Sequence, residues 1–226
     1  MHTDEHGSTG MNTDAHGCGR LRAAGVRLRA LALVLLISGA AHAQSGGSHG
    51  LVEFLLEYME VRYQGLDVDG DVLYVSVRSQ RMHHVRGRQL LRTYVISTSA
   101  QGLGGQQDSE RTPEGLHYVR ERIGHGLPPW SVLRERVCTG ELADSCTAGN
   151  EDLITSRILW LSGMEAGLNQ GGNVDSYARW IYIHGTADEC SLGTPSSHGC
   201  IRMSNADVIA LFDEVPIGAL VVIYDN

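Results

Sequence analysis

Short runs rich in β-branched and aromatic residues recur along the chain from position 71 onward. Such residues favour pleated strands, whereas apolar residues at helical spacing occur in only two segments. The runs cover residues 71–77, 90–97, 116–119, 157–161, 177–184 and 219–224. This pattern predicts a mainly β domain, sandwich-like or barrel-like, with one or two helices. A chain of 226 residues has room for one catalytic domain, which we expect over residues 71–226.

The first 43 residues have the pattern of a secretory signal peptide with a long polar start. Four arginines precede the apolar run 30–37, which is followed by the cleavage-type sequence Ala41-His42-Ala43. The run is shorter than the roughly 20 apolar residues of a membrane-spanning helix. We therefore expect an exported, periplasmic protein that begins near Gln44 and keeps no transmembrane segment. Met1 and Met11 are both candidate start sites.

The two helical patterns lie near the ends of the expected mature chain. A flexible stretch opens residues 44–70 and leads into an amphipathic helix, with Leu51, Leu55 and Met59 on its apolar face. Near the other end, Ser204 and Asp207 resemble a capping box that starts a second helix. A final strand follows this helix.

Charge and glycine spacing argue against nucleic acids and nucleotides as ligands. The net charge is −8, and all basic residues are arginine, so the chain lacks the basic footprint of a nucleic-acid binder. The glycines of the loop 99–112 lack the spacing of a dinucleotide motif, and no lysine is available for a phosphate-binding loop. We expect no cofactor and no nucleic-acid partner.

Cysteines in an exported protein are normally paired. The simplest pairing is a local bridge between Cys138 and Cys146, which would hold one loop. Cys190 has no evident assignment: it could be free, bridged elsewhere, or paired with Cys200 as a redox lock.

The densest group of reactive side chains lies between residues 183 and 203. His184-Gly185-Thr186 closes a predicted strand, and Ser197-His198-Gly199-Cys200-Ile201-Arg202 follows after a loop. A cysteine attacks as its thiolate, and a nearby imidazole can remove the thiol proton. A backbone N–H beside Gly199 and Cys200 is expected to face the developing oxyanion.

These two motifs resemble the signature of the L,D-transpeptidase (YkuD-type) catalytic domain. The segments 92–98, 112–115 and 215–218 also resemble that family, so the resemblance covers roughly residues 70–226. It implies a peptidoglycan transferase in which Cys200 attacks the stem tetrapeptide, releases D-alanine and forms a thioester. An amine acceptor then resolves the thioester: a second stem peptide, a wall-anchored lipoprotein or a free D-amino acid.

The same resemblance implies a role for each motif residue. His184 is the base, the carbonyl of Gly185 orients its ring, and His198 assists beside the thiol. Three further residues are assigned to the substrate site: Arg202, Ser197 and Tyr182. A guanidinium at Arg202 suits a substrate carboxylate, although an ion pair within the loop is an equal alternative.

Other interpretations of these residues remain open at this point. Water in place of an amine would make the enzyme a carboxypeptidase or endopeptidase. A disulfide between Cys190 and Cys200 would leave a non-catalytic wall-binding module. His184, Cys190, His198 and Cys200 could be imagined as zinc ligands, but their spacing lacks the short ligand pairs of structural sites, so no metal is expected.

Overall fold

The computed structural model describes residues 38–144 and 152–226, with side chains from residue 49 onward. The amino-terminal 37 residues of the expected signal peptide, and Cys146, lie outside these ranges. In chain order the elements are α1 (Ser38–Arg62), β1 (Asp71–Ser76), β2 (Arg81–Arg86), β3 (Gln89–Ser97), β4 (Gly115–Ile123), β5 (Ser131–Arg134), β6 (Val137–Leu142), β7 (Ile154–Gly163), β8 (Tyr182–Thr186), β9 (Ile201–Met203), α2 (Asn205–Glu214) and β10 (Leu220–Tyr224), with short 3-10 turns at Gly172–Val174 and Glu189–Ser191.

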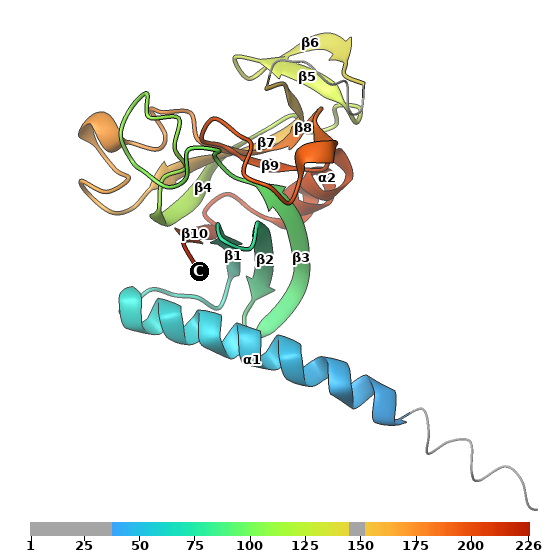
Figure 1. The fold of residues 1–226 in the computed structure, drawn as a ribbon, viewed down its shortest axis with the longest axis vertical. Coiled ribbons are helices and arrows are strands. Elements are labelled where there is room, and N and C mark those ends of the chain that lie inside the picture. Colours follow the sequence, from blue (N-terminus) through green and yellow to red (C-terminus); the bar gives the residue numbers. More distant parts are fainter. Residues whose placement is uncertain (1–37, 145–151) are drawn as a thin grey trace, which may run out of the picture. The chain divides into compact units, whose positions relative to one another are not determined.

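The strands form one sheet that closes on itself. Its order is β4-β10-β1-β2-β3-β9-β8-β7-β5-β6, and β4 also pairs with β7. This second pairing joins the two halves of the sheet into a barrel, with the β5–β6 hairpin attached outside the ring (Figure 1). The predicted mainly β, barrel-like architecture is therefore confirmed.

Helix α2 closes the inside of the barrel. Its Val208, Leu211 and Phe212 belong to the same buried cluster as inward-facing residues of the strands, including Leu73 and Ile183. The predicted helix start is confirmed, because Ser204 is the N-cap and its hydroxyl accepts from the Asp207 backbone N–H at 3.1 Å. The helix thereby starts immediately after β9, which anchors the end of the reactive segment.

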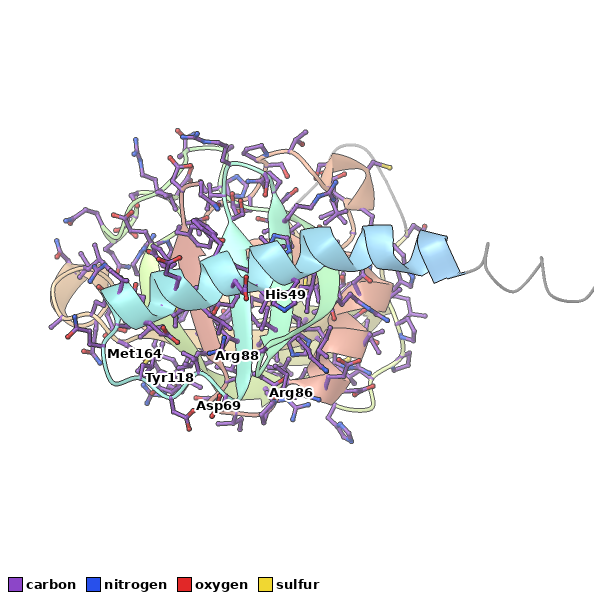
Figure 2. All side chains as sticks on the ribbon, turned by 90° about the horizontal axis from the view of Figure 1, so that it is seen from below. His49, Asp69, Arg86, Arg88, Tyr118 and Met164 are labelled. Atoms are coloured by element: carbon purple, nitrogen blue, oxygen red, sulfur yellow. The ribbon has the colours of Figure 1, made fainter. Side chains whose placement is uncertain are left out.

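Helix α1 covers an outer face of the sheet. Its Val52, Leu55, Leu56 and Met59 are buried in a second cluster that is supplied by β1, β2, β4 and β10. Figure 2 views the sheet from this side, with the helix crossing in front of the strands. The amphipathic helix was predicted, but residues 44–50 are already helical instead of forming a flexible linker.

Several strands lack the sequence pattern that would predict them. Strand β2 reads Arg-Met-His-His-Val-Arg, and its two histidines hide the alternation. The β5–β6 hairpin lies where a loop with a Cys138–Cys146 bridge was predicted; that bridge is wrong, because Cys138 is a free thiol. Within the described ranges, no helix is both long and apolar enough to cross a membrane.

Candidate active site

Two neighbouring parallel strands bring the motif residues together. In the register of β8 and β9, Ile183 is paired with Ile201 and His184 with Arg202. Cys200 immediately precedes β9 and continues this register, because its Sγ accepts from the Tyr182 backbone N–H at 3.4 Å. Alternate residues of a strand share one face, so Cys200 and Arg202 lie on the same side as His184.

His184 is held as a neutral imidazole. The residue is 1% exposed, and burial lowers the pKa of its imidazole, against an opposing effect of Asp152. Its Nδ1 lies 2.8 Å from the Gly185 carbonyl oxygen, which can only accept, so Nδ1 carries the proton. The other nitrogen, Nε2, therefore keeps a lone pair that can take a proton.

Gly185 is required by close packing rather than by its backbone angles. A side chain built at this position would place its Cβ 2.7 Å from the Thr155 carbonyl oxygen and 2.9 Å from Asn205 Oδ1. The Asn205 side chain also bonds Thr155 and Ser156 of β7 and the Thr186 carbonyl. This buried network links β7, β8 and α2 next to His184.

Cys200 is a free, partly buried thiol. Its Sγ donates to the Trp180 carbonyl oxygen at 3.4 Å. Burial raises the pKa of the thiol to about 12, and the Tyr182 N–H offsets only part of this effect. At neutral pH the pair is therefore a protonated thiol and a neutral imidazole, and little thiolate is present.

The loop before Cys200 is locked by its own hydrogen bonds. Ser197 is buried, and its hydroxyl donates to the Cys200 carbonyl at 2.6 Å and accepts from the Gly199 N–H at 3.2 Å. Gly199 has φ +127°, a conformation that side chains disfavour. Thr112 bonds the Gly199 carbonyl at 3.0 Å. The buried Ser197 thus holds the loop in shape through its hydroxyl. The backbone N–H expected to face an oxyanion lies beside Gly199 and Cys200, and that of Gly199 itself is directed at Ser197.

Arg202 is committed to a carboxylate that the sequence motifs do not include. Its Nη2 lies 2.5 Å from Asp152 Oδ2, and its side chain is 5% exposed. The same carboxylate oxygen lies 3.0 Å from His198 Nδ1. Arg202 and His198 hold the pKa of Asp152 below its usual value despite burial. Arg202 thus forms an ion pair, but with Asp152 before β7 instead of within its own loop, and its guanidinium is engaged by this carboxylate.

Aromatic rings and one arginine form the wall next to the thiol. Tyr182 is buried beside Trp160, in a cluster that Cys200 also contacts. Arg136, from the turn of the β5–β6 hairpin, donates to the Tyr182 hydroxyl at 3.1 Å and lies over the rings of Trp160 and Trp180. Tyr182 therefore contributes to this wall through its ring and to the thiol through its N–H.

The structure also decides between the alternatives that the sequence left open for Cys190. Cys190 is disulfide-bonded, while Cys200 is free. A redox lock between these two residues is therefore wrong. The disulfide also removes Cys190 from the imagined set of zinc ligands, since a metal needs a free thiolate.

The site as a whole can perform nucleophilic acyl transfer. It combines a thiol, a buried neutral imidazole with a free lone pair, and a second imidazole held by a carboxylate. Sequence reasoning missed Asp152 because it precedes β7, far from both motifs in the chain, and no spacing rule marks it. Only the pairing of β7 with β8 brings it beside them.

The chain matches the family model of the L,D-transpeptidase catalytic domain, YkuD, over residues 70–223. It is 41% identical over 71 residues to the putative L,D-transpeptidase YqjB of Bacillus subtilis, covering 25% of this chain and 40% of that protein. It is 49% identical over 48 residues to the probable L,D-transpeptidase ErfK/SrfK of Escherichia coli, covering 21% of this chain and 16% of that protein. The aligned region is thus less than half of either relative.

Two solved structures of L,D-transpeptidases also align with the chain. An L,D-transpeptidase from Mycobacterium smegmatis aligns with a TM-score of 0.43 at 16% identity, over 68% of this chain and 58% of that one. The structure of the L,D-transpeptidase LdtMt1 in complex with imipenem aligns with a TM-score of 0.43 at 18% identity, over 69% and 59%.

Proposed function

We propose that this chain, which belongs to the L,D-transpeptidase (YkuD) catalytic-domain family, is an exported peptidoglycan L,D-transpeptidase with Cys200 as its nucleophile. The observation that carries the proposal is the free Cys200 thiol on the sheet face that also holds the buried, neutral His184. The substrate would be the stem tetrapeptide of peptidoglycan. The signal-like segment before Gln44 supports a periplasmic location.

In the first half of the reaction, a thioester forms and D-alanine leaves. The S–H bond rotates away from the Trp180 carbonyl, and His184 Nε2 takes the proton as Sγ attacks the carbonyl before D-alanine. The C–N bond then breaks, and the imidazolium returns the proton to the departing amine. The thioester remains on Cys200, and His184 is neutral again.

In the second half, an acceptor amine attacks the thioester and frees the thiol. The amine could belong to a second stem peptide, a wall-anchored lipoprotein or a free D-amino acid. Water at the same intermediate would give carboxypeptidase or endopeptidase activity. The products therefore distinguish a transferase from a hydrolase, and both outcomes keep Cys200 as nucleophile.

Product analysis tests the proposal directly. The purified protein is incubated with a disaccharide tetrapeptide and a D-amino acid, and the products are identified by mass spectrometry. We expect D-alanine release, cross-linked or exchanged peptides, and a thioester on Cys200. Cys200→Ala should abolish all three, whereas Cys138→Ala, at the other free thiol of the described chain, should retain them. Shortened peptides alone would contradict the transferase, and full activity of Cys200→Ala would contradict the nucleophile.

A covalent inhibitor offers a second measurement. One solved L,D-transpeptidase is described in complex with imipenem. We expect the same compound to add its mass to this chain at Cys200, and to leave Cys200→Ala unmodified.

A further inference from the structure

The two imidazoles next to Cys200 have opposite environments. His184 is buried and bonded to a backbone carbonyl. The side chain of His198 is 63% exposed and contacts the Asp152 carboxylate at 3.0 Å. One base is thus closed off from solvent while the other can exchange protons with water.

Asp152 determines which nitrogen of His198 is available. A carboxylate oxygen accepts, so Nδ1 of His198 donates to it and Nε2 is left for a ligand. Arg202 holds the same carboxylate oxygen from the other side at 2.5 Å. The Asp152 carboxylate is therefore fixed, and it would stabilise a positive charge on the His198 ring.

A cavity of about 260 Å³ lies on the His198 side of the nucleophile. His198 and Trp180 line it, and the Trp180 carbonyl is the group that accepts from Cys200 Sγ. Asp108 and Glu110 also line the cavity, together with Arg179. Arg179 donates to the backbone carbonyls of Gly104 and Arg111 and interacts with Asp108, so the two carboxylates outnumber the single guanidinium in the lining. The cavity therefore suits a cationic amine.

We propose that this cavity is the acceptor site of the enzyme, and that His198, positioned by Asp152, takes the first proton from the acceptor ammonium. The inference rests on the proposed transpeptidase function. A primary amine enters at neutral pH as an ammonium ion, which has no lone pair for attack. It must lose one proton before it reacts and a second one when the amide forms.

His198 and His184 can then each accept one of the two protons. His198 Nε2 takes the ammonium proton and passes it to solvent. The free amine attacks the thioester carbonyl, and the N–C bond forms. His184 takes the second N–H proton and returns it to Sγ as the C–S bond breaks. Ammonium and thioester thus give amide, thiol and one proton in solvent, so atoms and charges balance.

Several charged groups face His198. Asp152 contacts it directly, and Arg202 and His184 act on Asp152. From the cavity side, Asp108, Glu110 and Arg179 share the lining with His198. The test therefore measures how the effect of substituting His198 depends on the pKa of the acceptor amine, which the protein does not set.

The experiment measures the two half-reactions separately in the intact chain. The thioester is formed with tetrapeptide and followed by intact mass. An acceptor is then added, either the α-amino group of a D-amino acid amide (reference pKa about 7.7 to 8.0) or the ε-amino group of a blocked lysine (about 10.4). Wild type is compared with His198→Gln, Asp152→Asn and the control His83→Gln, whose ring bonds Thr93 on the β2–β3 pair instead.

For His198→Gln we expect aminolysis at pH 7 to be reduced by about 100-fold, which is a larger factor than the reduction in thioester formation. The deficit should be larger for the ε-amino acceptor and should shrink as the pH approaches the pKa of the acceptor. The aminolysis rate of Asp152→Asn should also be reduced, and that of His83→Gln should match wild type. Equal losses in both half-reactions, or a deficit that does not change with pH, would overturn the inference. A wild type that forms no thioester would instead overturn the proposed function.

Discussion

The imidazole of His184 donates from Nδ1 to the carbonyl oxygen of Gly185, its own neighbour in the chain, at 2.8 Å. The His184 ring is therefore oriented by a backbone carbonyl. The position of this carbonyl depends on the close packing of Gly185. A methyl group at position 185 would meet the Thr155 carbonyl at 2.7 Å.

Gly185→Ala should consequently damage both stability and activity. Moving the Thr155 backbone or Asn205 to admit the methyl group should cost about 1 to 3 kcal/mol in the free energy of unfolding, and the displaced carbonyl should slow thioester formation. Urea denaturation and intact-mass kinetics measure the two effects. Gly70→Ala is the control, because a Cβ there meets nothing within 4 Å. Equal stability of the two variants would contradict the packing role.

The resting thiol of Cys200 should react slowly with alkylating agents. Burial raises its pKa to about 12, so the thiolate is scarce and the rate should rise about tenfold per pH unit from pH 7 to 10. A thiol at the reference pKa of about 8.5 would level off near pH 9. Iodoacetamide labelling of the Cys200 peptide, followed by mass spectrometry, measures this rate. A plateau below pH 8 would show that a thiolate exists before substrate binds.

Acid should destabilise the fold through His117. Its ring is buried between the Gly115 carbonyl and Ser176 Oγ, and burial lowers its pKa to about 4. Between pH 6.5 and 4 the unfolded chain binds a proton at this position and the folded chain does not, so stability falls as pH falls, by about 3 kcal/mol in total. Chemical unfolding at a series of pH values should show a shallower decline in His117→Gln. His125→Gln, at an exposed position, should keep the wild-type slope.

Glu165 should stabilise the packing of helix α1 on the sheet. Its carboxylate accepts from Tyr63 Oη at 2.9 Å, from Arg62 at 2.8 Å and from the Leu116 N–H at 2.7 Å. Glu165→Ala leaves the Leu116 donor without this acceptor, so we expect a loss of about 3 kcal/mol in the free energy of unfolding. Glu57→Ala, on the exposed side of the same helix, should change it by less than about 0.5 kcal/mol. Urea denaturation compares the two variants.

The sequence predicted those parts of the fold that carry a local signal. Helix α2 has a capping residue and helical apolar spacing, and strand β10 is a β-branched run, so both were found. Strand β2 and the β5–β6 hairpin were missed because polar residues interrupt their alternation. The hairpin segment was instead given a disulfide, which the free Cys138 contradicts.

The candidate site was predictable to the same degree. Cys200, His184 and the Gly185 carbonyl share short motifs, and the structure places them on one pair of strands. Asp152 belongs to no motif, and its relation to His198 and Arg202 depends on the pairing of β7 with β8. Asp152 could not be identified as the partner of Arg202 for the same reason, since the two residues are far apart in the chain.

The closed sheet also bears on how the protein behaves at high concentration. A strand whose backbone groups are all paired offers no template on which another molecule can add a strand. Among the strands that the structure describes, β6 stands at the end of the pairing order, with Val137 and Leu142 exposed at its two ends. Between them lie Gly140 and Glu141, which are disfavoured in strands. Self-association through intermolecular β-sheet would therefore start at this hairpin, and a charge at Val137 is the change most suited to improving solubility.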